Sequence, residues 1–158
     1  MEQLTHLDKD NNPGMVDVAQ KQVTYRTATA QSIVVLPDAV LQHLAGGELQ
    51  SKKGSVFQTA IVAGIMAAKK TGDLIPLCHP LGMDNCKVTI ALSAQNEVVI
   101  ECTASVTAKT GIEMEALVGA SIAALTVYDM CKAMSHDIVI KQTRLISKTG
   151  GKRDFKRS

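Results

Sequence analysis

The chain has 158 residues and a formal net charge of +2, and 46% of its residues are hydrophobic, 20% charged and 3% aromatic. This length fits one domain with a real core, and the hydrophobic share excludes a disordered polypeptide. The near-neutral charge and the scarcity of aromatic side chains argue against a protein that binds DNA or single-stranded nucleic acid.

Local patterns predict the first elements of the chain. Residues 1–14 are polar and end in Asn-Asn-Pro-Gly, which predicts a flexible arm. The alternating stretch 22–36 is rich in Thr and Val, and it predicts a strand. Pro37 then opens a short helix that we expect to end at Gly46 and Gly47.

A second helix is expected after a polar loop. Ser55, followed three residues later by Gln58, has the pattern of a capping box in front of an apolar run. That run ends in Lys69, Lys70 and Gly72, which favour a helix C-terminus.

The second half of the chain is predicted as a loop, a hairpin, a long helix and a last strand. Two prolines in the apolar stretch 74–82 exclude a regular helix or a central strand, so this loop should pack against the domain and serve a purpose. Stretches 87–92 and 98–108 form a candidate hairpin. A capping box at 110–113 starts a long apolar helix, and 137–147 predicts the last strand.

The order of these elements, β-α-α-β-β-α-β, indicates the fold class. Without the short first helix it is the split βαβ pattern of ferredoxin-like folds. We therefore predict an α+β protein with a ferredoxin-like split βαβ sandwich: an antiparallel sheet with helices on one face, plus an extra short helix. Residues 15–158 should form this single domain behind the flexible arm at residues 1–14.

The cysteines and the polar N-terminus bear on the compartment. The N-terminus lacks the apolar run of a signal peptide, and no apolar run approaches the roughly 18 residues of a membrane span. We therefore predict a cytoplasmic protein that contacts no membrane and keeps its thiols reduced. The cysteines show neither CxxC spacing nor the density of a disulfide framework, and they are Cys78, Cys86, Cys102 and Cys131.

The long helix is expected to need a partner. Between Glu115 and Asp129 it carries almost no charge and is apolar on every side, whereas a helix covering one face of a sheet should show a polar stripe. A subunit interface would explain this, and the alternative is that small residues face water. Glu113 and Asp129 are separated by about 24 Å of helix, so one ligand could touch both ends if two chains share a site.

Asp129 and Lys132 share a helix face and interrupt this uncharged helix. A surface ion pair is one interpretation, and a catalytic pair in nearly dry surroundings is the other. A lysine that acts as a base needs desolvation or a nearby cation. Lys53 could supply that cation or act as an acid itself.

Two other groups of residues are candidates for binding. Cys78 and His79 are adjacent, and adjacent side chains seldom hold one metal, so we predict no metal site. His79 is better suited to a hydrogen bond with a polar ligand, or it has a structural role. The stretch 52–54, Lys-Lys-Gly, leads into a helix N-terminus and predicts a phosphate site. Further positive charge could come from Lys21, Arg26, Lys148 and Lys152.

The chain resembles the MoaC family, the cyclic pyranopterin monophosphate synthases, from about Met15 to Phe155. The likeness rests on the stretches MVDVAQK, AGIMAAKKTGDLIPLCHPL, TGIEMEALVGASIAALTVYDMCKA and KTGG. It implies a lyase of molybdenum cofactor biosynthesis that acts on 3′,8-cyclo-7,8-dihydroguanosine 5′-triphosphate and releases pyrophosphate. It also implies a homohexamer, a trimer of dimers with active sites at the dimer interfaces, and no metal or organic cofactor.

The resemblance assigns roles to individual residues. Asp129 matches the catalytic aspartate of the family, and Lys53 and Lys132 match its two essential lysines. The positions that match substrate-binding residues or basic residues near the site are Leu77, Cys78, His79, Glu113, Met114, Lys21 and Arg26.

The chain departs from the family pattern at three places. Ser55 stands where an aspartate is usual, Ile61 stands where an arginine is common, and GGKRDF is one residue shorter than the usual motif. These differences leave two other interpretations open. One is a module on the same scaffold that binds a nucleotide or a protein without catalysis. The other is a metal-dependent hydrolase that uses Cys78 and His79.

Overall fold

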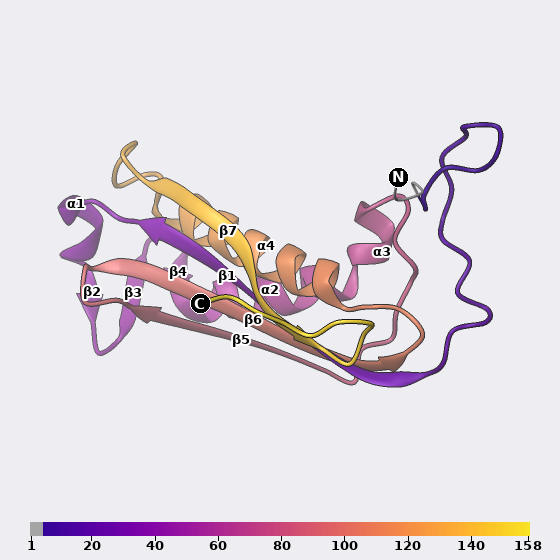
Figure 1. The fold of residues 1–158 in the computed structure, drawn as a ribbon. Coiled ribbons are helices and arrows are strands. Elements are labelled where there is room, and N and C mark those ends of the chain that lie inside the picture. The colour runs from indigo at the N-terminus through magenta and orange to yellow at the C-terminus, as the bar shows by residue number, and fades with distance from the viewer. Residues whose placement is uncertain (1–4) are drawn as a thin grey trace.

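The computed structural model describes residues 5–158, which form a five-stranded antiparallel sheet with two long helices on one face (Figure 1). Residues 1–4 of the predicted arm lie outside the described residues. Residues 5–14 make a turn in which the Asp8 side chain accepts hydrogen bonds from Asp10 and Asn12, and the flexibility of the arm stays a prediction. The elements are β1 Thr24–Val35, α1 Asp38–Leu41, β2 Leu44–Ala45, β3 Glu48–Ser51, β4 Gly54–Ser55, α2 Val56–Lys69, α3 Thr71–Leu74, β5 Asn85–Leu92, β6 Glu97–Ala108, α4 Glu113–Cys131, β7 Val139–Thr149 and β8 Phe155–Lys156.

The strand order confirms the predicted fold class. The sheet runs β5-β6-β1-β7-β8, and each neighbouring pair is antiparallel. The connection from β1 through α2 to β5 passes over β6, and the connection from β6 through α4 to β7 passes over β1. These two interleaved β-α-β units form the split βαβ pattern. The small β2-β3-β4 sheet and β8 are additions that the sequence patterns did not reveal.

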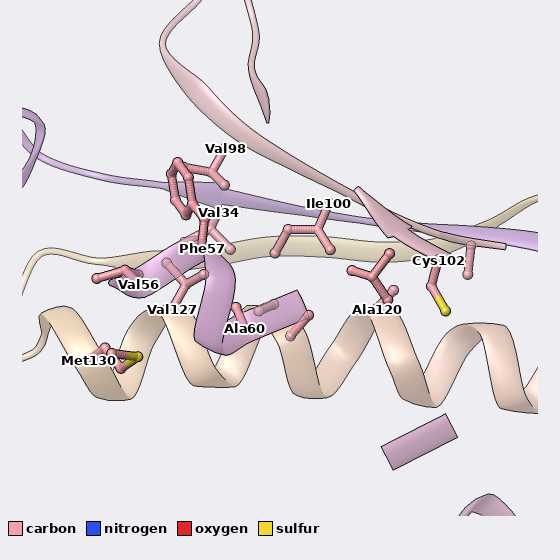
Figure 2. Packing of buried hydrophobic residues seen from close by; sticks show 14 of the residues in the cluster. Val34, Val56, Phe57, Ala60, Val98, Ile100, Cys102, Ala120, Val127 and Met130 are labelled. Atoms are coloured by element: carbon pink, nitrogen blue, oxygen red, sulfur yellow. The ribbon is translucent and has the colours of Figure 1, made fainter. Parts of the chain in front are cut away.

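The core lies between the sheet and the two helices, and it is built mainly from aliphatic and small side chains, with Phe57 and Met130 among the few large ones (Figure 2). Along β1, Ala28, Ala30 and Val34 are buried against the helices. The alternate residues Thr27 and Thr29 face the other side, where their hydroxyls bond threonines of β7 and β6. This alternation is the period of a strand with one face in the core.

Helices α2 and α4 touch through their backbones where Gly64 meets Gly119. A Cβ at Gly64 would lie 2.9 Å from the carbonyl oxygen of Gly119, and a Cβ at Gly119 would lie 2.6 Å from the sulfur of Cys102. Neither position has room for a side chain, so the two helices can approach this closely because both residues are glycine.

Gly64→Ala is therefore expected to lower stability. Overpacking against a backbone atom costs about 1–3 kcal/mol, which exceeds the gain of about 1 kcal/mol from placing alanine rather than glycine in a helix. Thermal unfolding followed by circular dichroism should show a Tm lower by a few degrees. Gly82→Ala is the matched control, because no described atom lies within 4 Å of its Cβ position. Equal Tm values for the two variants would contradict the expected clash.

The first short helix and the two glycines differ from the sequence prediction. Helix α1 ends at Leu41, and Gly46 and Gly47 have positive φ angles of 60° and 77°. They form the turn between β2 and β3 rather than the end of a helix. Two consecutive residues with positive φ are the requirement of a tight hairpin turn, which explains why Gly-Gly is found here.

The predicted helix ends are also corrected. Helix α4 begins after Ile112, whose side chain has no atom that can accept a hydrogen bond, so the expected capping box at 110–113 does not form. Helix α2 ends at Lys69 with Lys70 as its C-cap, and Gly72 lies within α3 rather than terminating α2.

Helix α4 is long and apolar enough to cross a membrane by length and composition, with a mean hydropathy of 1.3 over 18 residues. The expectation that no run approaches this length was therefore wrong for α4. Half of that window is buried inside the fold, as in the core helices of many soluble proteins. One side of α4 packs on the sheet and another on α2, and Leu125 remains 52% exposed.

Candidate active site

Two hollows lie at opposite ends of α4. The first, of about 440 Å³, adjoins the N-terminus of the helix, and the second, of about 640 Å³, adjoins its C-terminus. Figure 1 shows α4 lying along the sheet. The first contains Glu113 and the second contains Asp129, so about 24 Å of helix separates the two groups.

The second hollow brings together the three predicted catalytic side chains. The Nζ of Lys53 lies 2.8 Å from one carboxylate oxygen of Asp129, and the Nζ of Lys132 lies 3.2 Å from the other. Lys53 also donates to the main-chain oxygen of Asp129 at 3.3 Å. Hydrogen bonds from Lys53 and then Lys132 hold the pKa of Asp129 below its usual value, so the carboxyl group is ionised.

These three side chains are about half exposed in one chain. Their exposed fractions are 52% for Lys53, 54% for Asp129 and 58% for Lys132. The nearly dry surroundings that we expected around Asp129 and Lys132 are therefore not provided by one chain alone. A partner or a ligand would have to cover the hollow to remove water from this cluster.

The predicted phosphate site at the start of α2 is filled by the chain itself. The carboxylate of Glu48 accepts hydrogen bonds from the backbone N–H groups of Phe57, at 2.7 Å, and Gln58, at 3.0 Å. These are the groups that an anion would use. Ser55 is the N-cap residue of α2, as expected, but its side chain makes no capping bond. Its hydroxyl instead accepts a hydrogen bond from Gln50 at 3.0 Å.

The first hollow gathers the predicted binding residues of the proline loop and of the start of α4. In this loop the Nε2 of His79 lies 2.7 Å from the carbonyl oxygen of Val16. A carbonyl only accepts, so Nε2 carries the proton and Nδ1 of a neutral ring can accept a proton or a hydrogen bond. The predicted residues that line this hollow are Lys21, Leu77, Cys78, His79, Glu113 and Met114.

Glu113 and Cys78 differ in charge within this hollow. The carboxylate of Glu113 lies 3.1 Å from the Nζ of Lys148, which holds it toward β7. Burial raises the pKa of the Cys78 thiol, and the nearby Glu115 raises it further, so Cys78 is a neutral thiol. Among residues 5–158 no group of three or more His, Cys, Asp and Glu side chains could hold a metal ion.

Arg26 is placed differently from the other predicted binding residues. Its guanidinium donates to the main-chain oxygens of Ala108, at 3.2 Å, and Lys109, at 3.3 Å. In residues 5–158 it lines neither of the two hollows. Arg26 thus ties β1 to the segment that leads into α4, while Lys152 lines the first hollow.

Glu115 is a candidate site residue that the sequence analysis missed. It lines the first hollow, only 4% of its surface is exposed, and burial raises the pKa of its carboxyl group. Because burial disfavours the charged form, this carboxyl keeps its proton to a higher pH than an exposed glutamate does. The signal in the sequence was a second glutamate inside an apolar helix, two residues after Glu113.

Together the two ends of α4 offer complementary chemistry. The second hollow has an ionised carboxylate between two ammonium groups, which suits proton transfer and the neutralisation of phosphate charge. The first has an imidazole with a fixed tautomer, a neutral thiol and two carboxyl groups, which suit recognition of a polar ring by hydrogen bonds.

Known proteins resemble this chain along nearly its whole length. A protein called cyclic pyranopterin monophosphate synthase from Xanthomonas campestris pv. campestris (strain B100) is 54% identical over 152 residues, which cover 96% of this chain and 92% of that protein. The molybdenum cofactor biosynthesis bifunctional protein of Synechocystis is 53% identical, and the match covers 95% of this chain but 44% of that protein. Molybdenum cofactor biosynthesis protein 1 of Dictyostelium discoideum is 48% identical, with 26% of its length covered.

The family model described as the MoaC family matches residues 15–151, from the segment before β1 to the end of β7 and the turn that follows it. Both hollows lie largely within these residues. Since the model spans most of the chain and the first relative is matched over nearly all of its length, the chain belongs to the MoaC family.

Proposed function

We propose that the chain is a cyclic pyranopterin monophosphate synthase, which converts 3′,8-cyclo-7,8-dihydroguanosine 5′-triphosphate to cyclic pyranopterin monophosphate and pyrophosphate. The observation that carries this proposal is the cluster of Lys53, Asp129 and Lys132, joined by contacts of 2.8 and 3.2 Å. The name of the relative that is 54% identical supports the same reaction.

The reaction needs proton transfers and a departing anion. The five-membered ring of the base must open, a pyranopterin must close, and a sugar hydroxyl must attack the α-phosphorus and expel pyrophosphate. Lys53 and Lys132 supply positive charge for the phosphates and can exchange protons with the reacting rings. Asp129 holds both ammonium groups in place, and His79 with Glu113 binds the base end of the substrate.

A complete site would combine hollows from two chains. One nucleotide-sized substrate does not span about 24 Å of helix, so the second hollow of one chain would face the first hollow of another. Exposed apolar side chains support such pairing, with Val62 56% exposed, Met66 51% and Leu125 52%. We propose a dimer with two shared sites within a homohexamer, located in the cytoplasm.

Turnover of the cyclised triphosphate tests the reaction. Purified protein incubated with this substrate should release pyrophosphate and form the cyclic monophosphate, detected by coupled phosphate assay and mass spectrometry. Activity should persist in EDTA, whereas a metal-dependent hydrolase would lose it. Binding of the substrate without turnover would favour the non-catalytic module. The departures from the family pattern at Ser55 and Ile61 are the reason to test for this outcome.

A further inference from the structure

The hairpin formed by β3 and β4 carries Lys53 at its turn and leads directly into α2. The hairpin has two residue pairs, of which the inner one joins Ser51 and Gly54 across the turn. Isolated hairpins of this size are at best marginally stable in water. The position of the Lys53 ammonium group over Asp129 therefore depends on what else holds this hairpin.

Glu48 fastens the base of the hairpin to the first turn of α2. Its Oε1 accepts hydrogen bonds from the backbone N–H groups of Leu49 and Phe57, both at 2.7 Å. Its Oε2 accepts one from Gln58 at 3.0 Å. The first N–H groups of a helix have no partner within the helix, and a negative charge is favoured there by the helix dipole. One carboxylate thus joins β3 to α2.

Two further side chains hold the middle and the turn of the hairpin. The amide of Gln50 donates to the hydroxyl of Ser55 at 3.0 Å. The hydroxyl of Ser51 accepts from the backbone N–H of Lys53 at 3.0 Å and donates to the carbonyl of Gly54 at 3.2 Å. These bonds lie within the hairpin, so they shape it but do not fix it against the helix. Glu48 makes the polar connection to the helix, beside the fully buried Leu49 that anchors β3 in the core.

We propose that Glu48 is a positioning residue, which sets the β3–β4 hairpin against α2 so that Lys53 meets Asp129. This inference rests on the proposed function, because it concerns the same catalytic cluster. The carboxylate of Glu48 is bonded to backbone groups, while the side chain of Lys53 is bonded to Asp129 at 2.8 Å. Glu48 therefore acts on the reaction through Lys53.

Glu48→Gln in the full-length protein tests this role, because it keeps the size but replaces one accepting oxygen with a donor. We expect kcat to fall about 10- to 100-fold while KM changes less than about threefold. The Asp129 carboxyl, followed by carbon-13 NMR, should titrate at higher pH because Lys53 has moved away. Apart from Lys53, the charged or titratable groups that line the second hollow beside Asp129 are Lys52, Lys132 and His43.

A double variant separates positioning from helix capping. In Glu48→Gln/Ser55→Asp, an aspartate at the N-cap can accept from the first N–H groups of α2, but it does not restore the link that the Glu48 carboxylate makes from the start of β3. We expect Tm to recover while kcat and the Asp129 titration stay altered. If Glu48→Gln alone folds poorly, the double variant can be used to test the positioning role in its place. Glu97→Gln is the matched control, since it breaks a 2.8 Å surface ion pair with Lys141 and should leave both readouts unchanged.

The outcomes distinguish the two proposals. Wild-type kcat and an unchanged Asp129 titration in Glu48→Gln would overturn the positioning role. Full recovery of kcat, Tm and titration in the double variant would also overturn it, because Glu48 would then only cap the helix. A shifted titration in Glu48→Gln, together with no turnover by the unaltered protein, would support the positioning role and reject the proposed reaction.

Discussion

Asp129→Asn should lower kcat by about 10³-fold, which is within the range for the loss of one proton-transfer or charge-stabilising group. Asparagine keeps the shape of the side chain but removes the charge that holds Lys53 at 2.8 Å and Lys132 at 3.2 Å. The two ammonium groups would then repel each other and leave their positions. Steady-state pyrophosphate release measures the effect.

The pH dependence of the unaltered protein offers a second test of Asp129. Because its neighbours lower the pKa of Asp129 below the ordinary value of 3.8, the carboxylate stays ionised as the pH falls to that value. Any loss of kcat between pH 7 and pH 4 should therefore come from another group and persist in Asp129→Asn. Asp38→Asn, an exposed position on α1, is the control and should keep full activity. A loss smaller than about tenfold in Asp129→Asn would exclude a catalytic role.

Mixing two inactive variants should restore activity if the sites are shared between chains. Lys132→Ala damages the second hollow, and Glu113→Ala damages the first. In a mixed two-fold dimer, one site receives both damaged halves and the other receives two intact ones. Random exchange makes about half of the dimers mixed, so about a quarter of the wild-type activity should return. Pyrophosphate release before and after exchange measures this recovery.

A second mixture is the matched control for the first. Lys132→Ala and Lys53→Ala damage the same hollow, so no arrangement of the two chains yields an intact site. This mixture should stay inactive under the same exchange conditions, which mass spectrometry of differently labelled chains can verify. Equal activities for the two mixtures, with exchange demonstrated, would show that a site lies within one chain.

The sheet and the long helices could be predicted because their signals are local. Alternation in β1 and the apolar run of α4 are properties of consecutive residues. The order of elements, which defines the split βαβ fold, follows from such local patterns. The helix ends were less predictable. The cap of α2 comes from Glu48, in a different strand, and a capping box read from neighbouring residues cannot reveal a contact between distant elements. Glycine-glycine at 46–47 favours a helix end and a hairpin turn equally well.

The candidate site was predicted partly from residues and partly from resemblance. Spacing placed Asp129 and Lys132 on one helix face, and they lie 3.2 Å apart as an ion pair. Lys53 is 76 positions away from Asp129, so no local spacing predicts their contact. The sequence analysis could offer Lys53 only as one possible cation, and the resemblance then assigned it to the catalytic residues. Arg26 has the charge expected of a ligand-binding residue, but its guanidinium donates hydrogen bonds to backbone carbonyls of the protein. Charge alone does not tell whether a side chain meets a ligand or the protein.

The hydrogen bond between His79 and the Val16 carbonyl makes the segment before β1 one wall of the first hollow, which Thr5, His6 and Val18 also line. A bulky group attached at His6 would therefore compete for space with whatever enters that hollow. A peptide fused after Ser158 would instead follow the edge strand β8, whose residues Phe155 and Lys156 do not line the first hollow. Affinity tags on this protein are therefore better placed at the carboxyl end.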